Sequence, residues 1–394
     1  MLRIGIDFTD RIRNFIMGKR VGILANNSSR NRELESTVDI ILKMKAAKEI
    51  RVLTPEHGYY GEGQAGEPVK SWKKDDLEFM SLYYGDMESE IKDMDEKMRE
   101  LDTASGHENI LKNIFLEDLD AFIIDLQDTG SRVYTFASTM LHLFNVAGKD
   151  GKEFLILDRP NPVTGKYMEG PLLEEGYSSF IGMLRIPLRH GLTMGEIAIL
   201  YAKRNMDNIR VLKMEGWRRG MWYDETGLRW LMPSPNMPSP DTALLYQGNV
   251  MFEGTNVSEG RGTTRPFSII GAPWINAEKL MKNLNMRSDG SYKVIETKFR
   301  PFFSKYSGEI CNGVEIYVLN REKYRPIRFS IMLLQEISNY EEFNFHERYF
   351  DRVMGNSWVR ENIHSMDAEE IVDRMNMDIE KFKEERENFL LYKD

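Results

Sequence analysis

Short apolar runs that end in polar residues recur along the first half of the chain. Residues 20–25 and 50–53 are two such runs, and Val38, Ile41 and Leu42 recur between them at helical spacing. Apolar residues three and four apart share one face of a helix. We therefore predict two buried strands joined by a helix, which forms a parallel pair with a right-handed crossover.

The same alternation continues to about residue 215. Residues 120–128, 154–157 and 209–212 predict further strands, and the capping box Thr193-Met-Gly-Glu196 predicts the start of another helix. Repeated alternation of strand and helix is typical of a doubly wound α/β sheet. The pattern thus predicts a Rossmann-like, doubly wound α/β domain over residues 1–235.

Two further segments are less regular. Residues 80–84 resemble a strand, and residues 88–101 carry mixed charges that favour a solvated helix. Four prolines at positions 233, 235, 238 and 240 then predict an ordered connector. Beyond it, strand-like residues 314–319 and a capping pair formed by Asp367 and Glu370 predict a smaller α+β domain over residues 236–394. We expect this C-terminal domain to complete a cleft.

Composition narrows the class of protein. The chain has 394 residues, of which 41% are hydrophobic and 29% charged, as expected for a folded chain of two domains. Its net charge of −9 argues against nucleic acid as the main partner. We see no membrane-spanning run and no leader, and the single cysteine, Cys311, permits no internal disulfide. We therefore expect a cytoplasmic protein, and the sequence makes no prediction of its oligomeric state.

A polar, glycine-rich segment follows the second predicted strand. It spans residues 54–69 and contains Gly61-Glu-Gly-Gln-Ala-Gly66, which matches the dinucleotide fingerprint G-x-G-x-x-G. That fingerprint runs directly from a strand into a helix, whereas here a polar octapeptide precedes it and Pro68 follows. We therefore reject nucleotide binding for this motif. We expect that the glycines allow a positive φ or the close approach of another segment of the chain.

Metal sites and nucleophilic serine sites have little support in the sequence. Only six histidines occur, in no zinc-binding spacing, so we expect no metal and no cofactor. No G-x-S-x-G nucleophile motif occurs either. Carboxylates at strand tips remain, because the ends of parallel strands meet at one edge of a sheet. These carboxylates are Glu56, Asp125, Asp128 and Asp158, and a second polar segment, residues 252–265, adds Glu253 and Glu259.

Six blocks of the sequence together resemble the NamZ-type exo-β-N-acetylmuramidases, a family long filed as a domain of unknown function. The blocks are Thr-Pro-Glu-His-Gly-Tyr-Tyr-Gly-Glu-Gly-Gln-Ala-Gly, Asp-Leu-Gln-Asp-Thr-Gly-Ser-Arg-Val-Tyr-Thr-Phe, Leu-Asp-Arg-Pro-Asn-Pro-Val-Thr-Gly, Pro-Leu-Arg-His-Gly-Leu-Thr-Met-Gly-Glu, Pro-Ser-Pro-Asn-Met-Pro and Phe-Glu-Gly-Thr-Asn-Val-Ser-Glu-Gly-Arg-Gly-Thr-Thr-Arg-Pro-Phe. They stand in the family's order and span nearly the whole chain. One departure is Asn26-Asn27-Ser28-Ser29, where the family usually has Asn-Pro-Thr-Gly.

The resemblance implies a Rossmann-like domain, a smaller C-terminal domain and an active cleft between them. It also implies release of β-linked N-acetylmuramic acid from the non-reducing ends of peptidoglycan fragments, and it points to Glu56 as the catalytic acid/base. The other expected catalytic residues are His57, Asp125, Asp128, Glu253 and Glu259. The expected substrate-binding residues are Asn26, Asn27, Glu62, Gln127, Arg132, Tyr134, Arg159, His190, Asn256, Arg261 and Arg265.

Within this set, Arg132, Arg261 and Arg265 are candidates for the lactyl carboxylate, because a guanidinium matches carboxylate geometry. Two alternatives stay open: a sugar- or nucleotide-binding protein without turnover, and a metal-dependent hydrolase of a phosphoester or amide.

Overall fold

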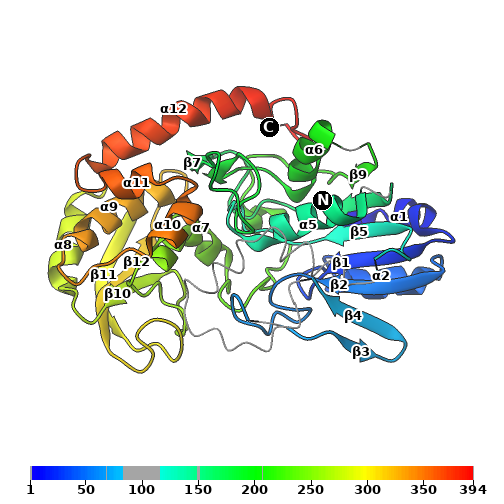
Figure 1. The fold of residues 1–394 in the computed structure, drawn as a ribbon, viewed down its shortest axis with the longest axis horizontal. Helices are drawn as coiled ribbons and strands as arrows, with labels where there is room; N and C mark the ends of the chain where they lie inside the picture. The colour runs from blue at the N-terminus through cyan, green and yellow to red at the C-terminus, as the bar shows by residue number, and fades with distance from the viewer. Residues whose placement is uncertain (1, 68, 83–115, 149–150, 206, 394) are drawn as a thin grey trace.

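The computed structural model describes the whole chain except residues 1, 68, 83–115, 149–150, 206 and 394. Figure 1 shows two regions side by side, an N-terminal region in blue to green and a C-terminal region in yellow to red. The predicted helix over residues 88–101 and the end of the predicted strand over residues 80–84 lie outside the described residues.

A seven-stranded sheet forms the centre of the N-terminal region. Its strand order is β3-β4-β2-β1-β5-β6-β9, and every neighbouring pair is parallel except β3 with β4. The strands are β1 (Arg20–Ala25), β2 (Glu49–Thr54), β3 (Trp72–Lys74), β4 (Leu77–Ser81), β5 (Ala121–Asp125), β6 (Glu153–Leu157) and β9 (Ile209–Leu212). Without β3, this order is that of the Rossmann fold, with its switch point between β1 and β5. The predicted fold class is confirmed.

Two hydrophobic cores cover the two faces of this sheet. Successive side chains of a strand point to opposite faces, so in β1 the neighbours Ile23 and Leu24 enter different cores. One core also takes apolar residues from α1 (Thr9–Ile16) and α2 (Thr37–Met44), and the other from α5 (Thr135–Ala147) and α6 (Met194–Asn205). The helix predicted between the first two strands is confirmed as α2, whereas α1 was not predicted.

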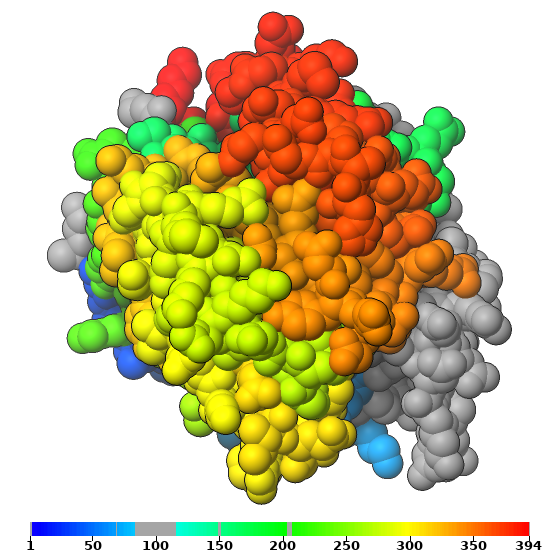
Figure 2. All heavy atoms as spheres, turned by 90° about the vertical axis from the view of Figure 1, so that its left-hand side faces the viewer, coloured from blue at the N-terminus to red at the C-terminus, as the bar shows by residue number. Residues whose placement is uncertain are grey.

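The C-terminal region is built on an antiparallel sheet in the order β10-β12-β11. Its strands are β10 (Ile269–Ala272), β11 (Tyr292–Phe299) and β12 (Cys311–Val318), and its helices are α7 (Pro240–Asn249), α8 (Ala277–Met286), α9 (Pro326–Ser338), α10 (Glu347–Met354) and α11 (Trp358–Asn362). Figure 2 shows the outer face of this region, where these segments form one continuous surface. Cys311 is buried in β12, and burial raises the pKa of its thiol to about 12.

The last helix joins the two regions. Helix α12 (Ala368–Arg386) packs against α9 and against β7 (Glu169–Leu172), which pairs with β8 (Pro187–Arg189). Figure 1 shows it crossing above both regions. Beyond it, the Tyr392 hydroxyl donates to buried Asp158 (2.5 Å), and burial raises the pKa of that carboxyl to about 6. The chain end therefore fixes the two regions to each other.

Both predicted capping boxes are present. The Thr193 backbone N–H donates to Glu196 (3.0 Å) and the Glu196 N–H donates back to the Thr193 hydroxyl (3.2 Å). Asp367 and Glu370 exchange the same pair of bonds at the start of α12 (2.8 and 2.9 Å). Among the described residues, the longest helices are too polar to span a lipid bilayer.

Candidate functional site

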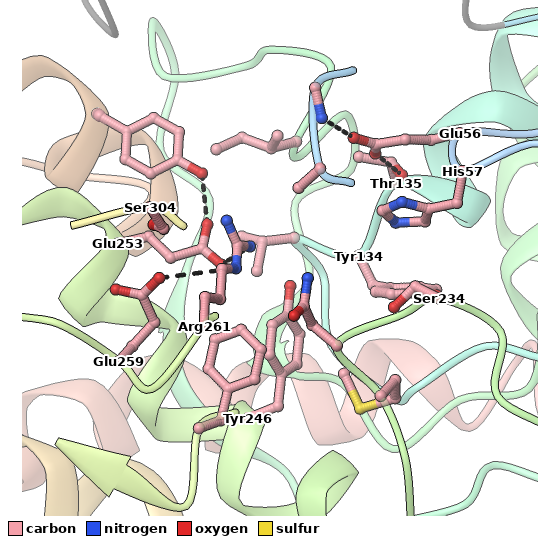
Figure 3. Close-up of a pocket in the computed structure, with 18 of the residues that line it drawn as sticks. Glu56, His57, Tyr134, Thr135, Ser234, Tyr246, Glu253, Glu259, Arg261 and Ser304 are labelled. Atoms are coloured by element: carbon pink, nitrogen blue, oxygen red, sulfur yellow. Dashed lines mark hydrogen bonds and ion pairs between the residues drawn. The ribbon is translucent and has the colours of Figure 1, made fainter. Parts of the chain in front are cut away.

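A pocket opens between the two regions, and segments from both of them line it (Figure 3). The lining residues of the N-terminal region form the N-terminal wall, which consists of Glu56, His57, Ala65, Gly66, Val133, Tyr134 and Thr135. Those beyond residue 240 form the C-terminal wall, which consists of Tyr246, Glu253, Glu259, Arg261, Phe267, Ser304, Lys305 and Tyr349. Phe180, Ile181, Ser234, Asn236 and Met237 complete the lining. The structure thus brings together the two polar segments singled out in the sequence, residues 54–69 and 252–265.

Glu56 lies two residues beyond the end of β2 and is only 5% exposed. Its two carboxylate oxygens have different neutral donors. The Gly66 backbone N–H donates to Oε1 (2.7 Å) and the Thr135 hydroxyl, in the first turn of α5, donates to Oε2 (2.5 Å). No charged side chain takes part in these two bonds, so within the described part of the chain neutral donors hold the carboxyl group in place.

His57 is held beside Glu56 by a strained backbone. Its φ of 75° is rare for a residue with a side chain, and its Nδ1 lies 2.8 Å from the Gly63 carbonyl oxygen. A carbonyl only accepts, so Nδ1 carries the hydrogen and Nε2 of the neutral ring is an acceptor. A Cβ on Gly63 would come within 2.7 Å of Val69, which explains the glycine there. Gly66 leads into strand β3 instead of a helix, so the context of a dinucleotide motif is absent.

The C-terminal wall is charged. Glu253, in the 3₁₀ helix η4 (Val250–Gly254), accepts hydrogen bonds from Arg261 and from the Tyr349 hydroxyl (2.6 Å). Burial raises the pKa of Glu253, although the Arg261 charge opposes this. The adjacent Gly254 has no room for a side chain, since a Cβ would lie 2.5 Å from the Phe350 backbone. This close contact with α10 explains how Tyr349 reaches the pocket.

Glu259 interacts with the same cations as Glu253, but its pKa is shifted in the opposite direction. Lys305 donates to its Oε2 (2.9 Å), and Nε of Arg261 lies 3.6 Å from its Oε1. Burial favours the neutral acid, yet the Lys305 and Arg261 charges outweigh it and lower the pKa of Glu259. The neighbouring carboxyls Glu253 and Glu259 thus have pKa values moved apart, an arrangement that separates proton-donor from anionic roles.

Each wall contributes one buried tyrosine, and the two rings meet. The pKa of Tyr246 is raised well above its usual value, first by burial and also by the charges of Glu253 and Glu56. Burial likewise raises the pKa of Tyr134, whose ring meets that of Tyr246 edge to face at 6.2 Å. Both hydroxyls therefore stay protonated and serve as neutral hydrogen-bonding groups. In the view of Figure 3, Tyr246 lies below both groups of carboxylates.

The strand-tip carboxylate Asp125 lies outside the pocket lining. It forms a buried ion pair with Arg159, whose Nη2 is 2.9 Å from Oδ2, and it also accepts from the Thr37 hydroxyl. Both charged groups are at least 96% buried, which favours a role in fixing the loops at the switch point. The expected catalytic role of Asp125 and the expected binding role of Arg159 thus have no support from their positions.

Asp128, Gln127 and His190 form a second buried group behind the pocket. Asp128 accepts from the Gly130 N–H (2.8 Å), and Nε2 of His190 lies 3.2 Å from its Oδ2. The Gln127 amide donates to the carbonyl oxygens of Asp128 (2.9 Å) and Pro160 (3.0 Å). These bonds brace the loop that leads to Tyr134.

Among the three arginines proposed for a carboxylate, only Arg261 lines the pocket. Arg132 is buried and donates to the carbonyl oxygens of Pro171, Ile186 and Val353, so it ties the two regions together. Arg265 pairs with Glu315 at 2.6 Å and is 48% exposed.

The remaining expected ligands, Asn26, Asn27, Glu62 and Asn256, also lie outside the lining. Asn26 donates to the Pro233 carbonyl (3.2 Å) and Asn27 accepts from Arg30 (2.6 Å). Glu62 accepts from the Tyr60 N–H (3.0 Å), and Asn256 donates to the Glu342 carbonyl (2.7 Å). Each of them shapes a loop.

Several lining residues were missed in the sequence. Ser234 and Asn236 stand in the Pro-Ser-Pro-Asn-Met-Pro block, which was recognised but given no role. Thr135 follows Tyr134 in another block. Lys305 and Tyr349 lie outside all six blocks, so no signal in the sequence marked them. Among the described residues, no cluster of three or more His, Cys, Asp or Glu side chains is placed to hold a metal ion.

Comparison with known proteins gives consistent results. The N-terminal model of the exo-β-N-acetylmuramidase NamZ matches residues 21–105 and 104–241, and the C-terminal model matches residues 244–392. A Bacillus subtilis (strain 168) protein described as peptidoglycan β-N-acetylmuramidase NamZ is 36% identical over 385 residues, which are 96% of this chain and 88% of that protein.

Two crystal structures of DUF1343 family proteins from Bacteroides fragilis NCTC 9343 are also similar. Their TM-scores are 0.83 and 0.76, at 30% and 27% identity, and each comparison covers 100% of this chain and 99% of the other. Matches to both family models and to a relative over nearly the full length leave one assignment: the chain belongs to the NamZ family of exo-β-N-acetylmuramidases.

Proposed function

We propose that this protein is an exo-acting glycoside hydrolase. Its substrate is β-linked N-acetylmuramic acid, or a related N-acetylated amino sugar, at the non-reducing ends of peptidoglycan fragments. The family assignment supports the reaction class. The observation that carries the site is the convergence of Glu56 and Glu253, from different regions of the chain, on one pocket.

Glu56 is the proposed acid/base. Cleavage of a glycosidic bond needs a carboxyl that protonates the leaving oxygen, and in a retaining course the same group later removes a proton from the attacking water. Among the described residues, Glu56 is held by two neutral donors, the Gly66 N–H and the Thr135 hydroxyl, so a change in its protonation breaks no ion pair with them. Nε2 of His57 can accept a hydrogen bond from a sugar hydroxyl or from the water.

The C-terminal wall is proposed to supply the second carboxyl and the anion site. Glu253 is the first choice for the second carboxyl because Arg261 and the Tyr349 hydroxyl hold it in the same pocket as Glu56. Arg261 is the one expected arginine in the lining, and we assign the lactyl carboxylate to it. A binding protein without turnover would need neither carboxyl to change its protonation.

The test is release of the chromophore from a chromogenic β-N-acetylmuramide. Glu56→Gln keeps the size of the side chain but removes its proton transfer, so kcat should fall by about 10³-fold. The matched control is Glu384→Gln, an exposed position on α12 far from the lining residues. It should retain the activity of the unmodified protein.

Three outcomes would contradict the proposal in different ways. Unchanged kcat in Glu56→Gln would remove Glu56 from the chemistry while leaving the reaction class intact. Absence of release from every N-acetylated amino sugar, together with measurable binding, would favour the non-catalytic reading. A reaction that stops on exhaustive chelation would favour the metal-dependent alternative.

A further inference from the structure

An exposed aromatic residue stands on a loop that reaches the pocket. The loop spans residues 300–308, between β11 and β12, and two of its members, Ser304 and Lys305, line the C-terminal wall. Phe302 is 89% exposed, the largest value among the exposed large hydrophobic residues of the described chain. Phe303, next to it, is 38% exposed. An apolar side chain kept in water so near a binding pocket requires an explanation.

This loop is held firmly in its conformation. The Phe302 N–H donates to the Gly262 carbonyl (2.8 Å), and the Gly308 N–H closes the loop onto the Pro301 carbonyl (2.8 Å). The Ser307 hydroxyl donates to the Phe302 carbonyl (2.8 Å). The aromatic ring therefore projects from a backbone that is fixed on both sides of it.

The same loop is fastened to the catalytic pocket. The Lys305 ammonium donates to the carbonyls of Phe252 (2.6 Å) and Val257 (3.0 Å) and to Glu259 (2.9 Å). The backbone at Phe303 lies against Gly262, where a Cβ would come within 2.4 Å of the Phe303 oxygen. Gly262 immediately follows Arg261, so the position of Phe302 is tied to the wall that carries Glu253 and Glu259.

We infer that Phe302 is a binding platform for the glycan on the leaving-group side of the scissile bond. This inference rests on the proposed function. An exo-acting enzyme takes one terminal sugar into its pocket, so the remaining sugars must pass over the pocket rim. Pyranose rings present faces of C–H groups, and these lose contact with water when they stack on an aromatic face. A rigid, exposed phenyl ring, two residues before the lining residue Ser304, matches such a ring face.

A polar rim would bind a peptide or a small anion better than it would bind the apolar face of a sugar ring. Two more exposed apolar residues stand in the same connection between β11 and β12, Phe303 in the loop and Ile310, 52% exposed, just beyond it. A second copy of the chain is the other occupant such a surface could take, and the experiment below separates the two.

The experiment compares Phe302→Ala with the unmodified protein on two substrates. One is N-acetylmuramyl fluoride, whose leaving group is a single atom and does not extend over the rim. The other is a four-sugar peptidoglycan fragment with N-acetylmuramic acid at its non-reducing end. We expect kcat/KM to fall by about 10-fold on the fragment, mainly through KM, and to change by less than about 2-fold on the fluoride.

Controls make the outcome specific. Met286→Ala removes a side chain of similar exposure (78%) from α8 and should leave both substrates unaffected. Phe302→Trp should restore the activity on the fragment, because it keeps an aromatic face. Equal losses on both substrates, or no loss on either, would overturn the inference. A change of oligomeric state in Phe302→Ala, seen by sedimentation, would overturn it in favour of a self-association surface. If the unmodified protein hydrolyses neither substrate, the proposed function itself fails.

Discussion

The two walls of the pocket hold their carboxylates by different means. On the N-terminal wall, Glu56 has two neutral donors, a backbone N–H and a hydroxyl. On the C-terminal wall, Glu253 and Glu259 lie within a group of charges that includes Arg261 and Lys305. A carboxyl with neutral partners can exchange a proton at little structural cost, whereas paired charges resist rearrangement. The difference suggests proton transfer on one side and recognition of a charged substrate on the other.

The largest expected effect on the fold concerns the ion pairs of the C-terminal wall. Arg261→Met removes a cation that pairs with two buried carboxyls, Glu253 (8% exposed) and Glu259 (2% exposed). We expect the free energy of unfolding to fall by about 3 kcal/mol at neutral pH, measured by denaturant titration. Arg265→Met removes a half-exposed pair in the same segment and should cost less than about 1 kcal/mol.

The pH dependence of this loss has a defined sign. Without Arg261, the folded-state pKa of Glu253, already raised by burial, rises further. A raised folded-state pKa means that the folded protein binds more protons than the unfolded chain, so stability falls as pH rises through that range. The destabilisation should therefore be smaller at pH 5 than at pH 8. An equal loss at both values would show that the charges of the wall are not responsible.

A smaller effect is expected from the support of Glu56. Thr135→Val removes the hydroxyl that donates to Oε2 but keeps the shape of the side chain. Because Glu56 then loses its fixed orientation, kcat should fall by about 10-fold with little change in KM. Thr135→Ser should restore it.

The control for this variant is Thr139→Val, one turn further along the same helix, where the hydroxyl donates only to the Thr135 carbonyl (2.9 Å). It should keep the activity of the unmodified protein. Loss of activity in both variants would indicate a general effect on α5 and not a role in positioning Glu56.

The smallest expected effect tests whether the C-terminal wall takes part in the chemistry. Tyr349→Phe removes the hydrogen bond to Glu253 that partly offsets the effect of burial on its pKa. The pKa of Glu253 should therefore rise. Any part of the plot of kcat against pH that depends on the ionisation of Glu253 should move to higher pH. At neutral pH the rate should change by about 3-fold.

Tyr340→Phe is the matched control, since its hydroxyl accepts from the Asn276 N–H outside the pocket lining. A pH profile of Tyr349→Phe that coincides with that of this control would restrict Glu253 to a structural role. A move to lower pH would contradict the electrostatics described for the wall.

The fold was largely predictable because its signals are local. Apolar runs of four to six residues, such as residues 20–25, mark strands that are buried on both faces. The pairs Thr193 with Glu196 and Asp367 with Glu370 mark helix starts through bonds between residues three apart. The β7–β8 pair gave no comparably regular pattern and was missed, and helix α1 was missed although Ile12, Phe15 and Ile16 stand at helical spacing in it.

The candidate site was only partly predictable. Position at a strand tip identified Glu56, but it gave the same prediction for Asp125, which the structure pairs with Arg159. Side-chain type could not separate the two, because a carboxylate suits both an ion pair and an acid/base. The separation depends on which cation reaches which strand tip, and that is a property of the packed loops.

The sequence by itself determined the doubly wound α/β class through the alternation of elements, and the family through six ordered blocks, whereas the strand order came from the structure. Only the tertiary structure decided which polar residues share the pocket. Lys305 and Tyr349 lie 52 and 96 residues beyond Glu253, in positions that no local pattern marks. They reach Glu259 and Glu253 because the 300–308 loop and α10 fold against the segment that carries both carboxyls. Contacts of that range follow from packing, which a linear pattern does not record.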